Sequence, residues 1–198
     1  MIRLLFATRN AHKTRELSEI LGDDFAIEDL RLHPEIGEIA EGGATFLENA
    51  QLKALTVSRQ LPGLVLADDS GLEVDSLGGG PGIFSARYAG ENAGDAANRA
   101  KLLAQLARLP NDAPTTARFR CVLVLARGGR LLGSYDGAVE GSIVRRECGQ
   151  GGFGYDSLFL PNEREETFAE MSAEEKNSLS HRAIAAHKLR VSLTRMVE

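Results

Sequence analysis

The stretch ADDSGLEVDSLGGGPGIFSARYAG, residues 67–90, decides how the rest of the chain is interpreted. It follows the apolar run at residues 64–67, which is typical of the last part of a buried strand. Two adjacent carboxylates, Asp68 and Asp69, come next, and a Ser-Gly turn is predicted after them. Ligands of open α/β sheets bind outside the carboxyl ends of strands. Adjacent acids there are costly unless a cation or water compensates them, so we expect either a ligand site or a polar turn with exposed acids.

Length and composition favour one domain of two lobes. The chain has 198 residues, of which 43% are hydrophobic, enough for a substantial core. Its formal net charge of −5 argues against a protein that coats a nucleic-acid polymer, because such proteins usually carry a basic face. Cys121 and Cys148 form neither a disulfide framework nor a zinc motif. No apolar run reaches the roughly 18 residues of a membrane span, so we expect a soluble cytoplasmic protein without membrane contacts.

The first turn after the first predicted strand resembles an anion site. Residues 2–7 predict a buried strand, and TRNAHK at residues 8–13 leads into a helix that ends at Gly22. A helix that begins there points backbone N–H groups and its dipole at an anion. Lys13 would lie in the first turn, beside that anion. The alternative is a plain N-cap by Asn10 with a solvated lysine.

A second helix is predicted after the loop at Glu41. Thr45 and Glu48 form a capping-box pattern. The helix carries an apolar stripe with steps of three and four, and Lys53 lies off that stripe. The stripe consists of Leu47, Ala50, Ala54, Val57 and Leu61. Glu41, just before the cap, is either a metal ligand or a solvated loop acid.

The remaining chain predicts a short strand at residues 25–27, a helix between Gly94 and Pro110, and a β-hairpin. The hairpin joins residues 115–126 to residues 130–139 and indicates an antiparallel part of the sheet. A second capping box at residues 172–175 opens one terminal helix. Lys176, His181 and Arg182 lie near the start of that helix, and three basic groups within seven residues favour a ligand site.

The glycine-rich sequence at residues 149–154 matches G-x-G-x-x-G, but it does not predict a dinucleotide site. That fingerprint must open a helix after a strand, whereas here an apolar run at residues 158–161 follows. We interpret the glycines as residues that let the backbone and the Phe153 ring approach a flat ligand. The sequence contains no P-loop motif.

Five segments together resemble one family, the noncanonical purine NTP pyrophosphatases, also called inosine triphosphate pyrophosphatases. They are T-x-N-x-x-K at residues 8–13, E-x-G-x-T-F-x-E-N-A at residues 41–50, the central motif at residues 67–88, GGFGYD at residues 151–156 and SHR at residues 180–182. The resemblance implies an α/β fold with an elongated mixed β-sheet flanked by helices. It implies two lobes with a central cleft, with residues 1–198 forming a single two-lobed domain.

The implied reaction is the Mg²⁺-dependent hydrolysis of ITP, dITP and XTP to the monophosphate and pyrophosphate by a homodimer. The resemblance makes Asp69 the catalytic base and, with Glu41, a magnesium ligand, while Asp68 would contribute through water. The implied substrate-binding residues are Thr8, Arg9, Asn10, Ala11, His12, Lys13, Lys53, Ser70, Phe153, Gly154, Tyr155, Asp156, Lys176, His181 and Arg182. Among them, Phe153 would stack on the base, and His181 and Arg182 would donate hydrogen bonds to its 6-oxo group.

Two alternatives remain at this point. One is a pyrophosphatase of the related Maf type that acts on other modified nucleotides, which the SHR and GGFGYD segments disfavour. The other is a nucleotide-binding or sensing module without activity. Asp69, Glu41 and Lys13 disfavour this module, because pure binding needs no acid pair facing a polyanion.

Overall fold

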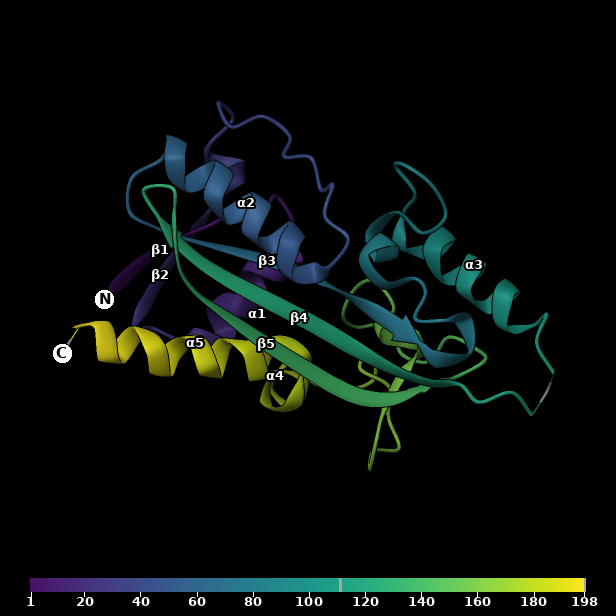
Figure 1. Ribbon diagram of the computed structural model, residues 1–198. Coiled ribbons are helices and arrows are strands. Elements are labelled where there is room, and N and C mark those ends of the chain that lie inside the picture. Colours follow the sequence, from purple (N-terminus) through teal and green to yellow (C-terminus); the bar gives the residue numbers. More distant parts are fainter. Residues whose placement is uncertain (111, 198) are drawn as a thin grey trace. The chain divides into compact units, whose positions relative to one another are not determined.

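The computed structural model describes residues 1–110 and 112–197, and its strands form a mixed sheet flanked by helices (Figure 1). The described strands lie in the order β2-β1-β3-β4-β5-β6. They are β1 Ile2–Phe6, β2 Phe25–Asp29, β3 Leu64–Val74, β4 Thr116–Arg127, β5 Arg130–Ile143 and β6 Phe159–Pro161. β1 is parallel to β2 and β3, whereas β5 is antiparallel to β6. The predicted fold class, a mixed α/β sheet flanked by helices, is therefore confirmed.

Five α-helices are described: α1 Ala11–Leu21, α2 Phe46–Gln60, α3 Asp95–Leu106, α4 Ala173–Leu179 and α5 His181–Val197. Short 3₁₀ turns connect several elements, among them Gly82–Arg87 before α3 and Asp156–Leu158 before β6. None of the described helices combines the length and the apolar character needed to cross a membrane.

The chain divides into two compact units, and each has its own core. Unit 1 comprises Met1–Asp69, Cys121–Gly137 and Ser180–Glu198, and unit 2 comprises Ser70–Arg120 and Ala138–Leu179. Strands β3, β4 and β5 each contribute residues to both units.

In unit 1, helices cover both faces of the sheet: α1 and α5 lie on one face and α2 on the other (Figure 1). Alternate strand residues, such as Leu66 and Leu123, form one core with Leu17 of α1 and Leu189 of α5. The intervening strand residues are buried as well, and so are Ala50, Ala54 and Val57 of α2. A strand covered on both faces reads as a continuous apolar run, as residues 121–126 do.

In unit 2, the core lies between the strands, α3 and the segment around Phe168. Leu102 and Leu106 of α3 are buried in it with Leu72 of β3. Three phenylalanine rings form its centre, with centroid distances of 4.8 Å between Phe119 and Phe159 and 5.2 Å between Phe159 and Phe168. Arg118 and Arg120 alternate with the buried residues of β4 and are only partly buried, so this part of the strand is half-covered.

The predicted end of the central strand at residue 67 is wrong. β3 continues without a turn through Asp68, Asp69, Ser70 and Gly71 to Val74. The two acids can stay inside a strand because cations from three helices compensate their charges, and no local sequence pattern reports this compensation.

The terminal segment, which we predicted to be a single helix, forms two helices in the structure. Its capping box is confirmed, since Glu175 N donates to Ser172 Oγ at 3.2 Å and Ser172 N donates to Glu175 Oε2 at 2.9 Å. However, α4 ends at Leu179, and the Ser180 hydroxyl accepts a hydrogen bond from Ala183 N at 3.2 Å, so it starts α5. The break places His181 and Arg182 in the first turn of α5.

Other local predictions are confirmed. Thr45 caps α2, and Gly22 follows the last residue of α1. Asn10 caps α1, as the alternative for this segment expected, but Lys13 pairs with Asp68 and is not a solvated lysine. The hairpin turns at Gly128 and Gly129, which both have positive φ. The predicted stripe of α2 is only partly right, because Leu47 is exposed and Lys53 is 8% exposed.

Gly137 of β5 lies against the backbone of α5, which generates a first prediction. A Cβ atom there would lie 2.0 Å from the His181 carbonyl oxygen and 2.7 Å from Ala185 N. We expect Gly137→Ala to lower the free energy of unfolding by about 3 kcal/mol, the upper end for overpacking, because backbone atoms must move. Urea unfolding measures this. Gly37→Ala is the matched control, since a Cβ at Gly37 meets nothing within 4 Å; equal effects of the two changes would contradict the prediction.

Candidate active site

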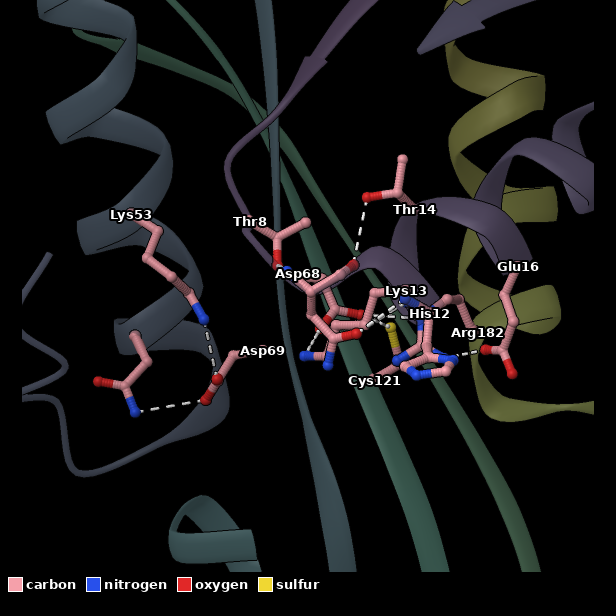
Figure 2. Close-up of polar contacts among 12 residues, drawn as sticks. Thr8, His12, Lys13, Thr14, Glu16, Lys53, Asp68, Asp69, Cys121 and Arg182 are labelled. Carbon is pink, nitrogen blue, oxygen red and sulfur yellow. Dashed lines mark hydrogen bonds and ion pairs between the residues drawn. The ribbon is translucent and has the colours of Figure 1, made fainter. Parts of the chain in front are cut away.

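The adjacent acids of the central motif face opposite sides of β3. Successive side chains of a strand alternate between its two faces, and Leu66, two residues before Asp68, lies in the core with α1 and α5. Asp68 therefore faces α1 and α5, and Asp69 faces α2. Figure 2 shows the two carboxylates pointing apart, each toward its own lysine.

Asp68 lies at the centre of a buried charge network. Its Oδ1 accepts a hydrogen bond from Lys13 Nζ, and its Oδ2 accepts bonds from Arg182 Nε at 3.1 Å and from Cys121 Sγ at 3.2 Å. Glu16 of α1 binds Nη1 of the same arginine. Asp68 and Arg182 are 2% and 1% exposed, so water contributes little to their solvation.

This network sets the ionisation of Asp68. Burial opposes ionisation, but the charges of Lys13 and Arg182 and the hydrogen bond from Lys13 hold the pKa of the carboxyl well below its ordinary value. The same burial, together with the adjacent carboxylate, raises the pKa of the Cys121 thiol well above its usual range. Asp68 is therefore charged at neutral pH and fixes the positions of two cations.

The environment of Asp69 on the other face is different. Lys53 Nζ donates to Asp69 Oδ1 at 3.0 Å and to Glu41 Oε1 at 2.7 Å, so one ammonium group lies between two carboxylates. Asn49 Nδ2 donates to Asp69 Oδ2 at 3.3 Å, and Asn49 Oδ1 accepts a bond from Gly43 N at 2.8 Å. Asn49 thus connects the acid to the loop that carries Glu41.

The pKa of Asp69 is raised. Burial is the largest cause, the charges of Lys53 and Lys13 oppose it, and Glu41 adds repulsion. The pKa of Lys53 is also raised, because Asp69 and Glu41 together outweigh the burial of the ammonium group. The two acids raise the pKa of the lysine, whereas the charge of the shared lysine opposes the effect of burial on Asp69 without cancelling it. A carboxylate with a raised pKa can accept a proton more readily than an ordinary one.

The residues around Asp69 fit a magnesium ion. Magnesium takes oxygen ligands, keeps several waters and shares them with substrate phosphates, so one or two protein carboxylates suffice. Glu41 and Asp69 already hold a cation, the Lys53 ammonium, between their oxygens. Within residues 1–110 and 112–197, no group of three or more His, Cys, Asp or Glu side chains is placed to hold a metal. This donor set suits a hydrated magnesium better than zinc, which takes three or four protein ligands.

The segment 8–13 comprises the end of the turn after β1 and the first residues of α1. Thr8 Oγ1 accepts a bond from Asn10 N at 3.1 Å, and Asn10 Oδ1 accepts bonds from the N–H groups of His12 and Lys13 at 2.9 and 3.3 Å. Ala11 is the first residue of α1. The start of α1 therefore combines a helix dipole with the Lys13 ammonium, which favours an anion.

Arg9, which the resemblance places among the substrate-binding residues, donates to the carbonyl oxygens of Leu30 and Ile36. It thereby holds the loop that follows β2. Ser70 follows Asp69 directly in β3. His181, at the start of α5, is 4% exposed.

Unit 2 contains the glycine-rich segment around Phe153. Gly152 and Gly154, which flank Phe153, both have positive φ, and a Cβ at Gly152 would lie 2.1 Å from Asp156 Oδ2. That oxygen accepts bonds from Phe153 N at 2.9 Å and from Lys176 Nζ at 2.5 Å. Lys176 Nζ lies 5.1 Å from the centroid of the Phe153 ring. No α-helix begins within this segment, as the sequence predicted.

Tyr155 is buried, and its hydroxyl donates to the Ser85 carbonyl oxygen at 2.9 Å. Its position supports the loop from the core of unit 2.

Sequence reasoning missed Glu16 and Asn49. A helical spacing could have indicated them, because Glu16 lies three residues from Lys13 and Asn49 four residues from Lys53. Cys121 gave no usable signal, since its apolar neighbours predict an ordinary core position.

The network around Asp68 generates a second prediction. We expect Asp68→Asn to lower the free energy of unfolding at pH 7 by about 3 kcal/mol, because one anion of the buried Arg182 is lost. The native pKa of Asp68 is below the unfolded value of about 3.9. Its stabilisation is therefore complete above that value and is lost as the pH falls through the native pKa.

Urea unfolding between pH 7 and pH 3 tests this, and the difference between wild type and Asp68→Asn should shrink toward low pH. Asp136→Asn is the control, because its pair with Lys188 is exposed and such pairs often contribute nothing measurable. A difference that stayed constant down to pH 3 would show that the charge of Asp68 is not what stabilises the fold.

Comparison with known proteins shows the family of the chain. The model of the Ham1 family matches residues 4–192. Proteins named dITP/XTP pyrophosphatase from Desulforamulus reducens and Geobacillus kaustophilus are 45% and 47% identical to the chain. These matches cover 98% and 96% of this chain and 97% and 93% of the relatives. A solved HAM1 protein from Coxiella burnetii has a TM-score of 0.87 at 37% identity, over 98% of this chain and all of the other. The resemblance found in the sequence is confirmed, and the chain belongs to the Ham1 family.

Proposed function

We propose that the protein hydrolyses the noncanonical purine triphosphates dITP, ITP and XTP to the monophosphate and pyrophosphate. The observation that carries the proposal is the pair Glu41 and Asp69 around the Lys53 ammonium, with the pKa of Asp69 raised. The name of the relatives, dITP/XTP pyrophosphatase, supports the same reaction. Membership of the Ham1 family gives no support to the Maf-type alternative.

In the proposed mechanism, Asp69 orients a water molecule and accepts its proton as the water oxygen attacks the α-phosphorus. The bond from the α-phosphorus to the bridging oxygen breaks, and pyrophosphate leaves with the electron pair. The raised pKa of Asp69 suits this proton transfer. Lys53 and Asn49 hold the carboxylate by hydrogen bonds to its two oxygens, so its direction is fixed before substrate binds.

Magnesium is the proposed cofactor, held by Glu41 and Asp69. When bound, it withdraws charge from the phosphates and lowers the pKa of a bound water. Lys53 would then share its donors between these acids and a phosphate oxygen, which its three N–H groups allow.

The triphosphate is proposed to bind at the start of α1. The residues are Thr8, Arg9, Asn10, Ala11, His12 and Lys13, with Ser70 following the catalytic acid. Lys13 is a point charge held by Asp68, and the dipole of α1 adds a positive potential at the helix start. Arg9 would contribute by holding the neighbouring loop, as its bonds to Leu30 and Ile36 indicate.

The base is proposed to be recognised through stacking and through donors. Phe153 would stack on the purine, and Gly154, Tyr155, Asp156 and Lys176 hold its loop. His181 and Arg182 would donate to the 6-oxo oxygen, because arginine is only a donor. Asp68 and Glu16 bind Nε and Nη1 of Arg182, which fixes the plane of the guanidinium group.

We extend the proposal to a homodimer in the cytoplasm, where a nucleotide pool supplies the substrate. The resemblance of the five sequence segments supports this extension.

Asp69→Asn tests the catalytic assignment. The variant keeps the shape of the side chain and removes the base, so we expect turnover of ITP at saturating Mg²⁺ to fall by about 10²- to 10⁴-fold. Steady-state release of pyrophosphate is the measurement, and Asp136→Asn, an exposed acid, should keep wild-type turnover. Retention of more than a tenth of the turnover by Asp69→Asn would exclude this acid as the base.

Selectivity tests the proposed function as a whole. Values of kcat/KM for ITP, XTP, GTP and ATP should show a preference of at least about a hundredfold for ITP and XTP over ATP. The reason is that the 6-amino group of adenine is a hydrogen-bond donor and would face the donors of His181 and Arg182. Arg182→Lys keeps a charge beside Asp68 but loses the planar fork, and it should narrow the ratio of ITP to ATP. The ratio of kcat/KM for ITP to that for ATP does not depend on the amount of folded enzyme, so a loss of stability in the variant would not change it.

ATP hydrolysis within tenfold of ITP hydrolysis by the wild type, or release of orthophosphate before pyrophosphate, would refute the proposed function.

A further inference from the structure

In unit 2, helix α3 holds both backbone polar groups of Gly154. Gly154 N donates to Asp95 Oδ2 at 2.7 Å, and Arg99 Nη1 donates to the Gly154 carbonyl oxygen at 2.9 Å. Asp95 and Arg99 lie four residues apart, so they share one face of the first turns of α3. They are more than fifty positions from Gly154 in sequence.

We propose that Asp95 and Arg99 are positioning residues that fix the Phe153 ring for stacking against the base. We call these two side chains the Gly154 clamp. The inference rests on the proposed function, because it assigns the ring to a purine, and it adds two residues that the family resemblance does not imply.

The loop needs such a restraint because of its composition. Gly152 and Gly154 both have positive φ, and glycine has the most conformational freedom to lose on ordering. An aromatic ring between two glycines would sample many orientations. Instead, three charged side chains hold the backbone on both sides of the ring: Asp156 accepts from Phe153 N, and the clamp binds Gly154.

The arginine of the clamp is itself held in place. Arg99 Nε lies 2.9 Å from Glu147 Oε2, and Ser157 Oγ donates to the same oxygen at 3.2 Å. Hydrogen bonds with one charged partner are shorter and stronger than neutral ones, and both bonds of the clamp are of this kind. The Lys176 ammonium near the face of the Phe153 ring adds a cation–π contact.

A fixed ring binds a base better than a mobile one, because the entropy of ordering is lost during folding and not during binding. Loss of the clamp should therefore raise KM and leave kcat nearly unchanged. Since stacking does not distinguish purines, KM for ITP and for ATP should rise together. A general loss of structure would instead lower the active fraction and hence kcat.

The absence of tryptophan from the chain permits a direct test. Phe153→Trp places the single tryptophan of the chain at the proposed stacking position, and selective excitation separates its emission from that of the tyrosines. In this background we would titrate inosine monophosphate and follow quenching, and we would measure the fluorescence anisotropy of the free protein. The clamp variants are Asp95→Ala and Arg99→Ala, and Asp95→Asn keeps an oxygen acceptor for Gly154 N.

The matched control is Lys101→Ala on the same helix. Lys101 Nζ also donates to a backbone carbonyl, that of Tyr88, at 2.5 Å, so this change removes an equivalent bond that does not reach Gly154.

We expect Asp95→Ala and Arg99→Ala each to weaken binding of inosine monophosphate by about two- to tenfold, the effect of one lost hydrogen bond. Both should lower the anisotropy of the tryptophan, Asp95→Asn should restore most of the affinity, and Lys101→Ala should change neither quantity. With Phe153 in place, the same variants should raise KM for ITP and keep kcat within about twofold.

The positioning role is overturned if Asp95→Ala and Arg99→Ala have the same affinity and anisotropy as Lys101→Ala. It is also overturned if these two variants lower the anisotropy of the tryptophan without weakening the binding of inosine monophosphate. It is further overturned if Asp95→Asn binds inosine monophosphate as weakly as Asp95→Ala does. The lost affinity would then come from the negative charge at the start of α3 and not from the hydrogen bond to Gly154 N. Failure of the proposed function gives a different result: the wild type would release no pyrophosphate from ITP, whatever the anisotropy of the variants.

Discussion

The structure of unit 1 depends on one constraint, the burial of two adjacent carboxylates inside a strand. Because side chains of a strand alternate, Asp68 and Asp69 face different layers, and each needs its own cation. Lys13 of α1 and Arg182 of α5 supply the charges on one face, and Lys53 of α2 supplies the charge on the other. Burying one partner without the other costs several kcal/mol, about 3–5 kcal/mol for a broken buried pair. The acids therefore determine which helix covers which face.

The glycine-rich loop of unit 2 is also stabilised by charged groups distant in sequence, but here they offset conformational freedom and not buried charge. In the proposed function, the glycines that flank Phe153 let its ring approach a flat ligand, but without a restraint they would leave the ring mobile. Charged side chains from α3 and from the loop itself then bind the backbone and remove that freedom. In both units, a feature that is unfavourable alone is stabilised by charged groups distant in sequence.

This dependence on distant groups explains which parts of the structure could be predicted. Caps and the Gly128-Gly129 hairpin are local, and the sequence predicted them well, whereas the apolar stripe of α2 was only partly right. The end of β3 was placed too early, because the compensating cations come from residues 13, 53 and 182. One signal was present but not used: in β4 the alternation at residues 116–120 becomes a continuous apolar run at residues 121–126, where unit 2 gives way to unit 1. Such a change marks a strand that becomes covered on both faces.

The two acids also show why residue type alone does not assign a role. Asp68 and Asp69 are neighbours in one strand and are both buried, yet their pKa values shift in opposite directions. Asp68 has two cations close to it and accepts bonds from both, so its pKa falls and it stays charged. Asp69 shares one lysine with Glu41, so its burial is less well compensated and its pKa rises. Burial and the sharing of Lys53 with Glu41 thus distinguish Asp69 from its neighbour. In the function proposed above, this difference leaves Asp68 to hold two cations and lets Asp69 accept a proton.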